Sequence, residues 1–258
     1  MTIFDYFITR QAFCFMAQKN KSFFKYALLT ISCVFTFSLV SACIAPAHAR
    51  MTFIPPARET PRPDRTSTVG GGSRGNSCAI GKANKNTASV VKILPQSNIG
   101  LTVEQRPSIM VYIAPTTAQK LFFSIQDEDF NDYYETTLHL PRKAGVMQVK
   151  LPASAPALVN GKNYQYSLAT ICGEYLQPDD YSVRGWIKRV QTKANLQNQR
   201  PSLELASKLA KEGIWYDALS TLAVVKKLQP SNQSVANSWQ QLLQSAGLGH
   251  ISQEPIVN

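Results

Sequence analysis

Residues Gly71–Gly75 fit the motif G-x-S-x-G, which in α/β-hydrolases carries the nucleophilic serine. That chemistry needs a strained turn between a strand and a helix, which lifts the serine above an oxyanion hole. No expected strand precedes Ser73 here and no expected helix follows it. The two histidines beyond residue 49, His139 and His250, lie in no pattern that would supply a general base. We therefore predict no catalytic residues and interpret the segment as a basic loop.

A second candidate for chemistry is the acidic stretch from Asp127 to Asp132, in which Asp127, Asp129 and Asn131 fit the opening of a calcium-binding loop. An EF-hand supplies glycine at the sixth position of this loop and glutamate at the twelfth. This chain has Asp132 and Leu138 there. We expect a solvated hairpin tip, with a weak calcium site of another type as the alternative, and predict no metal or cofactor.

Residues 1–49 have the composition of an export signal. Lysines precede an apolar run from Tyr26 to Val40, and the stretch ends in Ala47-His48-Ala49, a pattern that signal peptidases cleave. The run is shorter than the ~20 residues needed to cross a bilayer. We expect a periplasmic or extracellular protein cut near Ala49, whose true start is Met1 or Met16. The alternative is a lipoprotein: Val40–Cys43 fits a lipobox, so membrane attachment would require lipidation of Cys43.

Two cysteines, Cys78 and Cys172, lie beyond this signal. An even pair in an oxidising compartment favours a disulfide, and neither cysteine has a neighbour at the C-x-x-C spacing of a zinc site. The bond would join the start of the folded body to a late strand.

Positive charge is concentrated before the folded body. Residues 50–85 carry seven Lys and Arg against two acidic residues, whereas residues 86–258 carry 16 against 13. A nucleic-acid-binding protein would have a dense basic face on its folded part, so we predict no nucleic-acid partner. The smaller basic cluster near the last expected strand (Arg184, Trp186, Lys188 and Arg189) is the candidate binding surface. For Trp186, packing in the core or between domains is favoured over stacking on a carbohydrate. For the three basic residues the alternative is a solvated strand edge that discourages aggregation.

Three kinds of segment position these residues. Residues 50–77 are rich in Pro, Arg, Gly and Ser and are expected to form a disordered basic arm. Residues 78–192 alternate with period two between turn residues, without a helix, which predicts an antiparallel, immunoglobulin-like β-sandwich. The expected strands are 89–94, 108–114, 120–126, 133–140, 146–151, 164–172 and 181–190.

After Arg200 the period becomes helical, and residues 200–248 are expected to form three helices, near 202–211, 216–228 and 234–245. The fold class is therefore α+β. Gly213, Trp215, Ala218 and Pro230 resemble the turn, aromatic, small-residue and terminator positions of a tetratricopeptide repeat. A self-standing solenoid needs about three repeats, so we expect a helical hairpin and a further helix packed on the sandwich or on a partner.

A wider resemblance covers nearly the whole exported chain. The arm ending in Cys78, the acidic hairpin, Cys172, the segments Gly185–Val190 and Gly213–Leu219, and Trp239–Leu248 resemble a secreted cyanobacterial family known as domain of unknown function nine-two-eight. The resemblance implies an exported protein without an assigned activity.

These observations favour a non-catalytic protein of the cell envelope. Its basic arm would contact anionic envelope polysaccharide, since exposed positive charge favours polyanions. One alternative is a protein–protein scaffold that docks another envelope protein through the C-terminal helices. The other is a hydrolase acting on envelope polymers.

Overall fold

The computed structural model describes residues 50–56, 78, 88–192, 196 and 199–257. In the β-rich part, the strands follow from an alternation of buried and less buried residues along the chain. In β4 (Lys120–Asp127), Leu121, Phe123 and Ile125 are buried and their neighbours are only partly covered. The remaining strands are β1 (Val90–Lys92), β2 (Ile99–Thr102), β3 (Ser108–Ile113), β5 (Asp132–His139), β6 (Gly145–Lys150), β7 (Asn163–Ile171), β8 (Ser182–Arg189) and β9 (Ile256–Val257).

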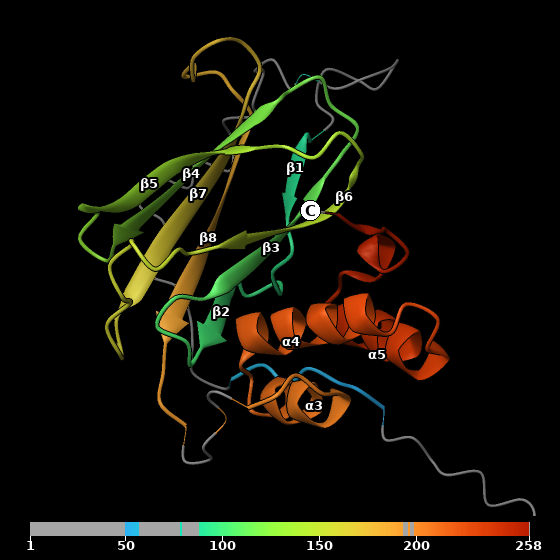
Figure 1. Ribbon diagram of the computed structural model, residues 1–258. Coiled ribbons are helices and arrows are strands. Elements are labelled where there is room, and N and C mark those ends of the chain that lie inside the picture. The colour runs from blue at the N-terminus through green and yellow to red at the C-terminus, as the bar shows by residue number, and fades with distance from the viewer. Residues whose placement is uncertain (1–49, 57–77, 79–87, 193–195, 197–198, 258) are drawn as a thin grey trace, which may run out of the picture. The chain divides into compact units, whose positions relative to one another are not determined.

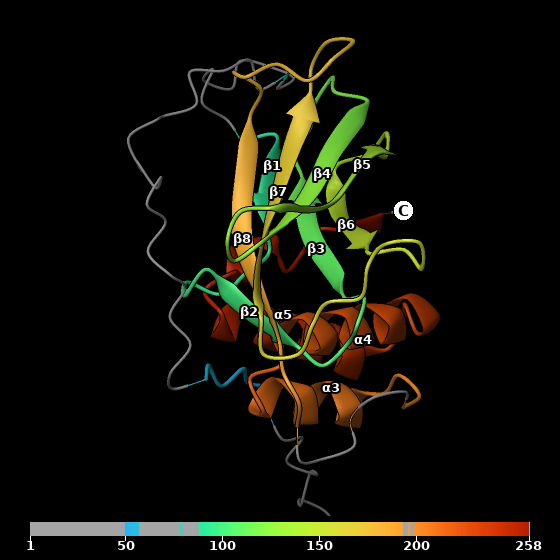
Figure 2. The ribbon, with the colours of Figure 1, turned by 90° about the vertical axis from the view of Figure 1, so that its left-hand side faces the viewer.

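The strands form two sheets, with orders β1-β3-β6-β9 and β2-β8-β7-β4-β5. Their inner faces share one hydrophobic core, and β1 contacts β7 and β8 of the other sheet, which gives a sandwich-like arrangement. Figures 1 and 2 show the two sheets from perpendicular directions. The prediction of an α+β fold is confirmed.

Both sheets are mixed, which differs from the expected antiparallel sandwich. The β1–β3, β3–β6, β4–β5, β4–β7 and β7–β8 pairings are antiparallel, whereas β2–β8 and β6–β9 are parallel. Parallel neighbours need a long crossover connection. The helices supply that crossover for β9, which returns to the sandwich after them.

One contact resembles the tyrosine corner of immunoglobulin-like sandwiches. The Val159 amide donates to the hydroxyl of Tyr164, at the start of β7, over 2.9 Å. The immunoglobulin-like topology itself stays a prediction.

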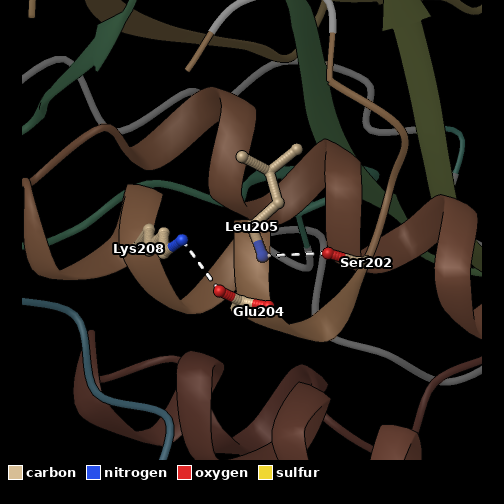
Figure 3. Close-up of polar contacts among 4 residues, drawn as sticks. All are labelled: Ser202, Glu204, Leu205 and Lys208. Atoms are coloured by element: carbon tan, nitrogen blue, oxygen red, sulfur yellow. Dashed lines mark hydrogen bonds and ion pairs between the residues drawn. The ribbon is translucent and has the colours of Figure 1, made fainter. Parts of the chain in front are cut away.

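The helices are α3 (Leu203–Lys211), α4 (Trp215–Leu228) and α5 (Gln233–Ser245), followed by the short η2 (Gly249–Ile251). Ser202 caps α3 by accepting the Leu205 amide, and Glu204 pairs with Lys208 at 2.8 Å (Figure 3). The expected helices begin and end within one residue of these bounds. Among the described residues, none of the helices combines the length and apolar character needed to span a membrane.

Helix α4 packs against the sandwich through its first turn. Trp215 donates through Nε1 to the Ile93 carbonyl, and Tyr216 donates its hydroxyl proton to the Trp186 carbonyl. The Tyr216 ring lies over Gly100 of β2, where an added Cβ would come within 2.5 Å of it. The helices therefore pack on the sandwich, and residues 50–258 form one compact unit.

Residues 51–56, called the strap below, lie against the helices (Figure 1, blue). Met51 and Phe53 are buried, and the Phe53 ring meets the Trp215 ring edge-on at 4.9 Å. The expectation of a disordered arm over 50–77 is therefore wrong for the strap, because its two alternate apolar side chains pack into a groove between the helices. Residues 57–77 lie outside the described residues.

Candidate functional site

The outer face of the five-stranded sheet carries short polar side chains. Strand alternation turns them away from the core, and the register aligns them in rows across β4, β7 and β8, which lie side by side in Figure 2. Ser124 pairs with Ser167, which in turn pairs with Arg184. Gln126 pairs with Gln165.

These rows form the floor of a groove of about 470 Å³, called the sheet groove below. Its floor comes from β4, β7 and β8, and its walls come from the β4–β5 hairpin and the β7–β8 loop. The lining residues are Phe122, Ser124, Gln126, Phe130, Gln165, Ser167, Ala169, Leu176, Gln177, Pro178, Asp180, Ser182 and Arg184.

The predicted disulfide fixes the base of the β7–β8 loop. Cys172 directly follows β7 and is bonded to Cys78, with 5.6 Å between their Cα atoms. The Cys78 carbonyl accepts the amide of Thr117 at 2.8 Å and the hydroxyl of Thr116 at 3.0 Å, which ties Cys78 to the segment before β4. The loop then turns on Asp180, whose Oδ2 accepts the Gln177 amide at 2.8 Å. The prediction of a disulfide between Cys78 and Cys172 is confirmed.

The β4–β5 hairpin presents Phe130 beside the groove. Asp127 holds the turn: its Oδ1 accepts the amides of Asp129 and Asn131, and its Oδ2 accepts the Asn131 side chain. The hydrogen bond from the Asn131 side chain is the main cause that lowers the pKa of Asp127. Phe130 adopts a left-handed conformation, with φ of 65°, and its side chain is 48% exposed. The Asp127 carboxylate thus holds the conformation of the turn. Within the described part of the chain, no acidic, His or Cys residues gather into a metal site.

Arg184 is the one arginine or lysine that lines the sheet groove. It is exposed, and its guanidinium makes no ion pair or hydrogen bond within the described part of the chain. The Arg184 carbonyl accepts Lys92 Nζ, whose amine also donates to Asn98 Oδ1, so the backbone beneath the side chain is held in place. The groove therefore offers one positive charge over a floor of uncharged side chains, and the Asp180 carboxylate lies in its wall.

The structure divides the four residues of the predicted binding surface. Arg184 lies in the groove. Trp186 is only 2% exposed, so the favoured prediction of packing is correct and this side chain cannot stack on a ligand. Arg189 Nη1 donates to the Leu158 carbonyl at 2.8 Å, which gives this arginine a structural task. Lys188 is half-buried outside the groove lining. Alternation along β8 places Arg184, Trp186 and Lys188 on one face and Arg189 on the other. The four residues therefore do not form the expected surface, because Trp186 is buried and Arg189 points to the opposite side.

Sequence reasoning missed the polar rows and the apolar walls. Serine and glutamine alternate with apolar residues in both β4 and β7, and this alternation is the sequence signal of an outer sheet face. The exposed side chains of Phe130 and Leu176, which is 41% exposed, gave no such signal, because their positions depend on how two loops turn.

Other candidates lie elsewhere. His139 is exposed at the end of β5, which forms the edge of its sheet, as expected. The motif around Ser73 lies outside the described residues. Asp217 is buried far from the groove lining, where Thr102 Oγ1 donates to one carboxylate oxygen and the Val103 amide to the other, both at 2.7 Å.

Comparison with known proteins identifies a family. A family model described as Domain of Unknown Function (DUF928) matches residues 69–256. This match covers β1 to β8, the helices, and the first residue of β9, so the sheet groove lies entirely within it. No curated protein matches the chain.

Proposed function

The chain belongs to the DUF928 family, whose description states no activity, and we propose that it is an exported, non-catalytic binding protein of the cell envelope. Its ligand is an anionic, hydroxyl-rich polymer, such as an acidic polysaccharide, and the sheet groove is the binding site.

The observation that carries this proposal is that Arg184, whose guanidinium has no partner among the described residues, lies over a floor of serine and glutamine. Hydroxyl and amide groups both donate and accept hydrogen bonds, as sugar hydroxyls do. A guanidinium binds a carboxylate or sulfate through two parallel hydrogen bonds. Phe130 and Leu176 add apolar surface for the C–H faces of sugar rings. The groove is not an enclosed cavity, which suits a chain-like ligand better than a small buried one.

The proposed location rests on the disulfide and on the leader sequence. A disulfide is compatible with a periplasmic or extracellular protein, since cytosolic thiols are kept reduced. We propose cleavage near Ala49, with lipidation at Cys43 as the alternative. The cyanobacterial origin stays part of this proposal. We also propose that the basic residues within 57–77 contribute to binding of the same polyanion.

Two other functions are less well supported. For a hydrolase, the groove lining holds one carboxylate, Asp180, and that carboxylate already accepts a backbone amide of its own loop. Glycoside hydrolysis ordinarily requires a pair of carboxyl groups on opposite sides of the bond. For a scaffold that uses the helices, which resemble a tetratricopeptide repeat, the groove beside α3 and α5 is already filled by the strap.

The test is a binding measurement with the unit 50–258 and an acidic polysaccharide, compared with a neutral polysaccharide of similar length. We expect R184A to weaken binding of the acidic polymer about tenfold, because truncating a charged hydrogen-bonding group costs roughly 1.5–3 kcal/mol. The matched control is R200A, since Arg200 is equally a surface arginine but lies outside the groove. Equal losses in both variants would show that charge alone, and not the groove, binds the polymer.

A further inference from the structure

The strap contacts the helices in the way a bound peptide does. Its backbone amides donate to groups of the helices: Met51 to Gln241 Oε1 at 2.9 Å, Phe53 to Ser245 Oγ at 2.9 Å, and Ile54 to the Ala210 carbonyl at 3.0 Å. Main-chain bonds of this kind hold an extended segment, while side chains at alternate positions fill pockets.

The side chains of the strap alternate accordingly. Met51 is 3% exposed and Phe53 is 5% exposed, whereas Ile54 is 53% exposed and Thr52 also faces solvent. Phe53 is the central anchor, because its ring packs on Trp215 at the start of α4.

The helices are shaped around this segment. Gly213 adopts a left-handed conformation with φ of 75°, and a Cβ there would lie 3.0 Å from the Ile54 carbonyl oxygen and 3.1 Å from Pro56. A hollow of about 230 Å³ continues beside Phe53 and Pro55 toward Gln96 and Gly247. The helices therefore form a receptor groove, called the strap groove below, and the strap is its ligand.

The strap is separated from the next fixed point of the chain, Cys78, by the 21 residues 57–77. A chain of that length can reach roughly 70 Å when extended, further than the radius of a domain of this size. The three backbone hydrogen bonds and the ring contact of the strap described above are all with the helices. The strap of a second copy could therefore make the same contacts, as in domain swapping.

We propose that the strap groove is a peptide-binding site for an extended segment with two alternate apolar anchors followed by proline, and that a second copy of this chain supplies this segment in solution. An exchange of straps links two copies through the same contacts that the strap makes within one copy, so no additional interface is needed. This site is separate from the sheet groove, so either proposal can fail without the other.

The first experiment tests the peptide site in the unit 50–258 with both anchors removed, M51S/F53S. A labelled peptide with the sequence of residues 50–56 should bind this variant saturably, measured by fluorescence anisotropy. The same peptide with alanine in place of Phe53 should bind at least about tenfold more weakly, as expected for a buried aromatic anchor. The matched control is I54S, which removes an exposed side chain and should leave the groove filled and the peptide unbound. Equal binding of both peptides, or no binding to folded M51S/F53S, would overturn the site.

The second experiment tests the exchange. Light scattering of the unchanged unit should show a dimer that grows with protein concentration, dissociates in excess peptide, is absent in M51S/F53S and persists in I54S. A unit that stays monomeric at millimolar concentration, or a dimer indifferent to the peptide, rules out exchange.

If M51S/F53S does not fold, isotope-filtered NMR on an equal mixture of labelled and unlabelled unchanged protein gives the same answer. Contacts between Phe53 of one copy and Trp215 of the other support the exchange, and contacts within one copy alone contradict it.

Discussion

At the scale of single residues, the charge of Asp217 affects stability, because this carboxyl group is buried. It lies in the first turn of α4, and burial raises its pKa to about 7, although hydrogen bonds from Val103 and Thr102 oppose the shift. The carboxyl is therefore neutral in the folded protein over a pH range in which it is ionised in the unfolded chain. Between these two pKa values the folded state binds more protons, so stability falls as pH rises.

This sign makes a prediction for D217N, which resembles the neutral carboxyl. The stabilisation from protonated Asp217 is fully present below about pH 4 and is lost as pH rises through about pH 7. The stability of the unchanged protein should therefore fall over this range relative to that of D217N, by roughly 4 kcal/mol near neutral pH. Melting curves of both proteins against pH measure it. Parallel curves would mean that Asp217 stays ionised in the fold.

At this scale the sequence predicted single residues poorly. It identified Cys78 and Cys172, because these are the two cysteines beyond residue 49 and only one pairing exists between them. It placed Trp186 and Arg189 with Arg184 because they are neighbours in the chain. Burial removes Trp186 from the surface, and alternation along β8 turns Arg189 to the opposite face, where it donates to the Leu158 carbonyl. Asp217 gave no signal, since its burial depends on β2, which lies more than a hundred residues earlier.

At the scale of elements, the disulfide joins the base of the β7–β8 loop to the segment before β1. The variant C78S/C172S should lose roughly 2–4 kcal/mol of unfolding free energy, because the bond closes a long loop in the unfolded chain. It should also weaken polymer binding, since the loop forms one wall of the sheet groove. Melting with and without reductant measures the first effect. The unit 50–258 contains no other cysteine, so an unchanged melting temperature of the original protein in reductant would contradict the prediction.

The contact between β2 and α4 gives a second prediction at this scale. In G100A the added methyl group meets the Tyr216 ring, which is itself buried, so the helix must shift. We expect a loss of roughly 1–3 kcal/mol, as for overpacking in other cores. The control is G173A, because nothing lies within 4 Å of a Cβ at Gly173. Urea denaturation compares the two, and similar stabilities would show that the helix accommodates the methyl group easily.

Strands and helices with a clear period were predictable, whereas the two short strands that pair in parallel, β2 and β9, were not. β2 contains Gly100 and spans four residues, and β9 spans two, too few for a recognisable alternation. Both pair in parallel with distant strands, and local turn signals carry no information about such pairings. The burial of the strap was not predicted for a similar reason. Met51 and Phe53 lie in a basic, proline-rich stretch, and they are buried only because they pack on the helices.

At the scale of the whole molecule, the helices complete the sandwich. The first turn of α4 supplies Trp215, Tyr216 and Asp217 to β1, β2 and β8, and β9 returns to β6 after the helices.

The predicted sandwich domain, residues 78–192, would lack these groups and expose the surface around Gly100 and Val103. We therefore expect this fragment to be unstable alone, with poorly dispersed NMR spectra and strong binding of hydrophobic dyes. In the unit 50–258, circular dichroism and tryptophan fluorescence should follow one unfolding transition, because sheets and helices share their core. A fragment 78–192 that unfolds cooperatively at the temperature of the full unit would instead make the helices a dispensable appendage, and the contacts of α4 would then contribute little to the stability of the sheets.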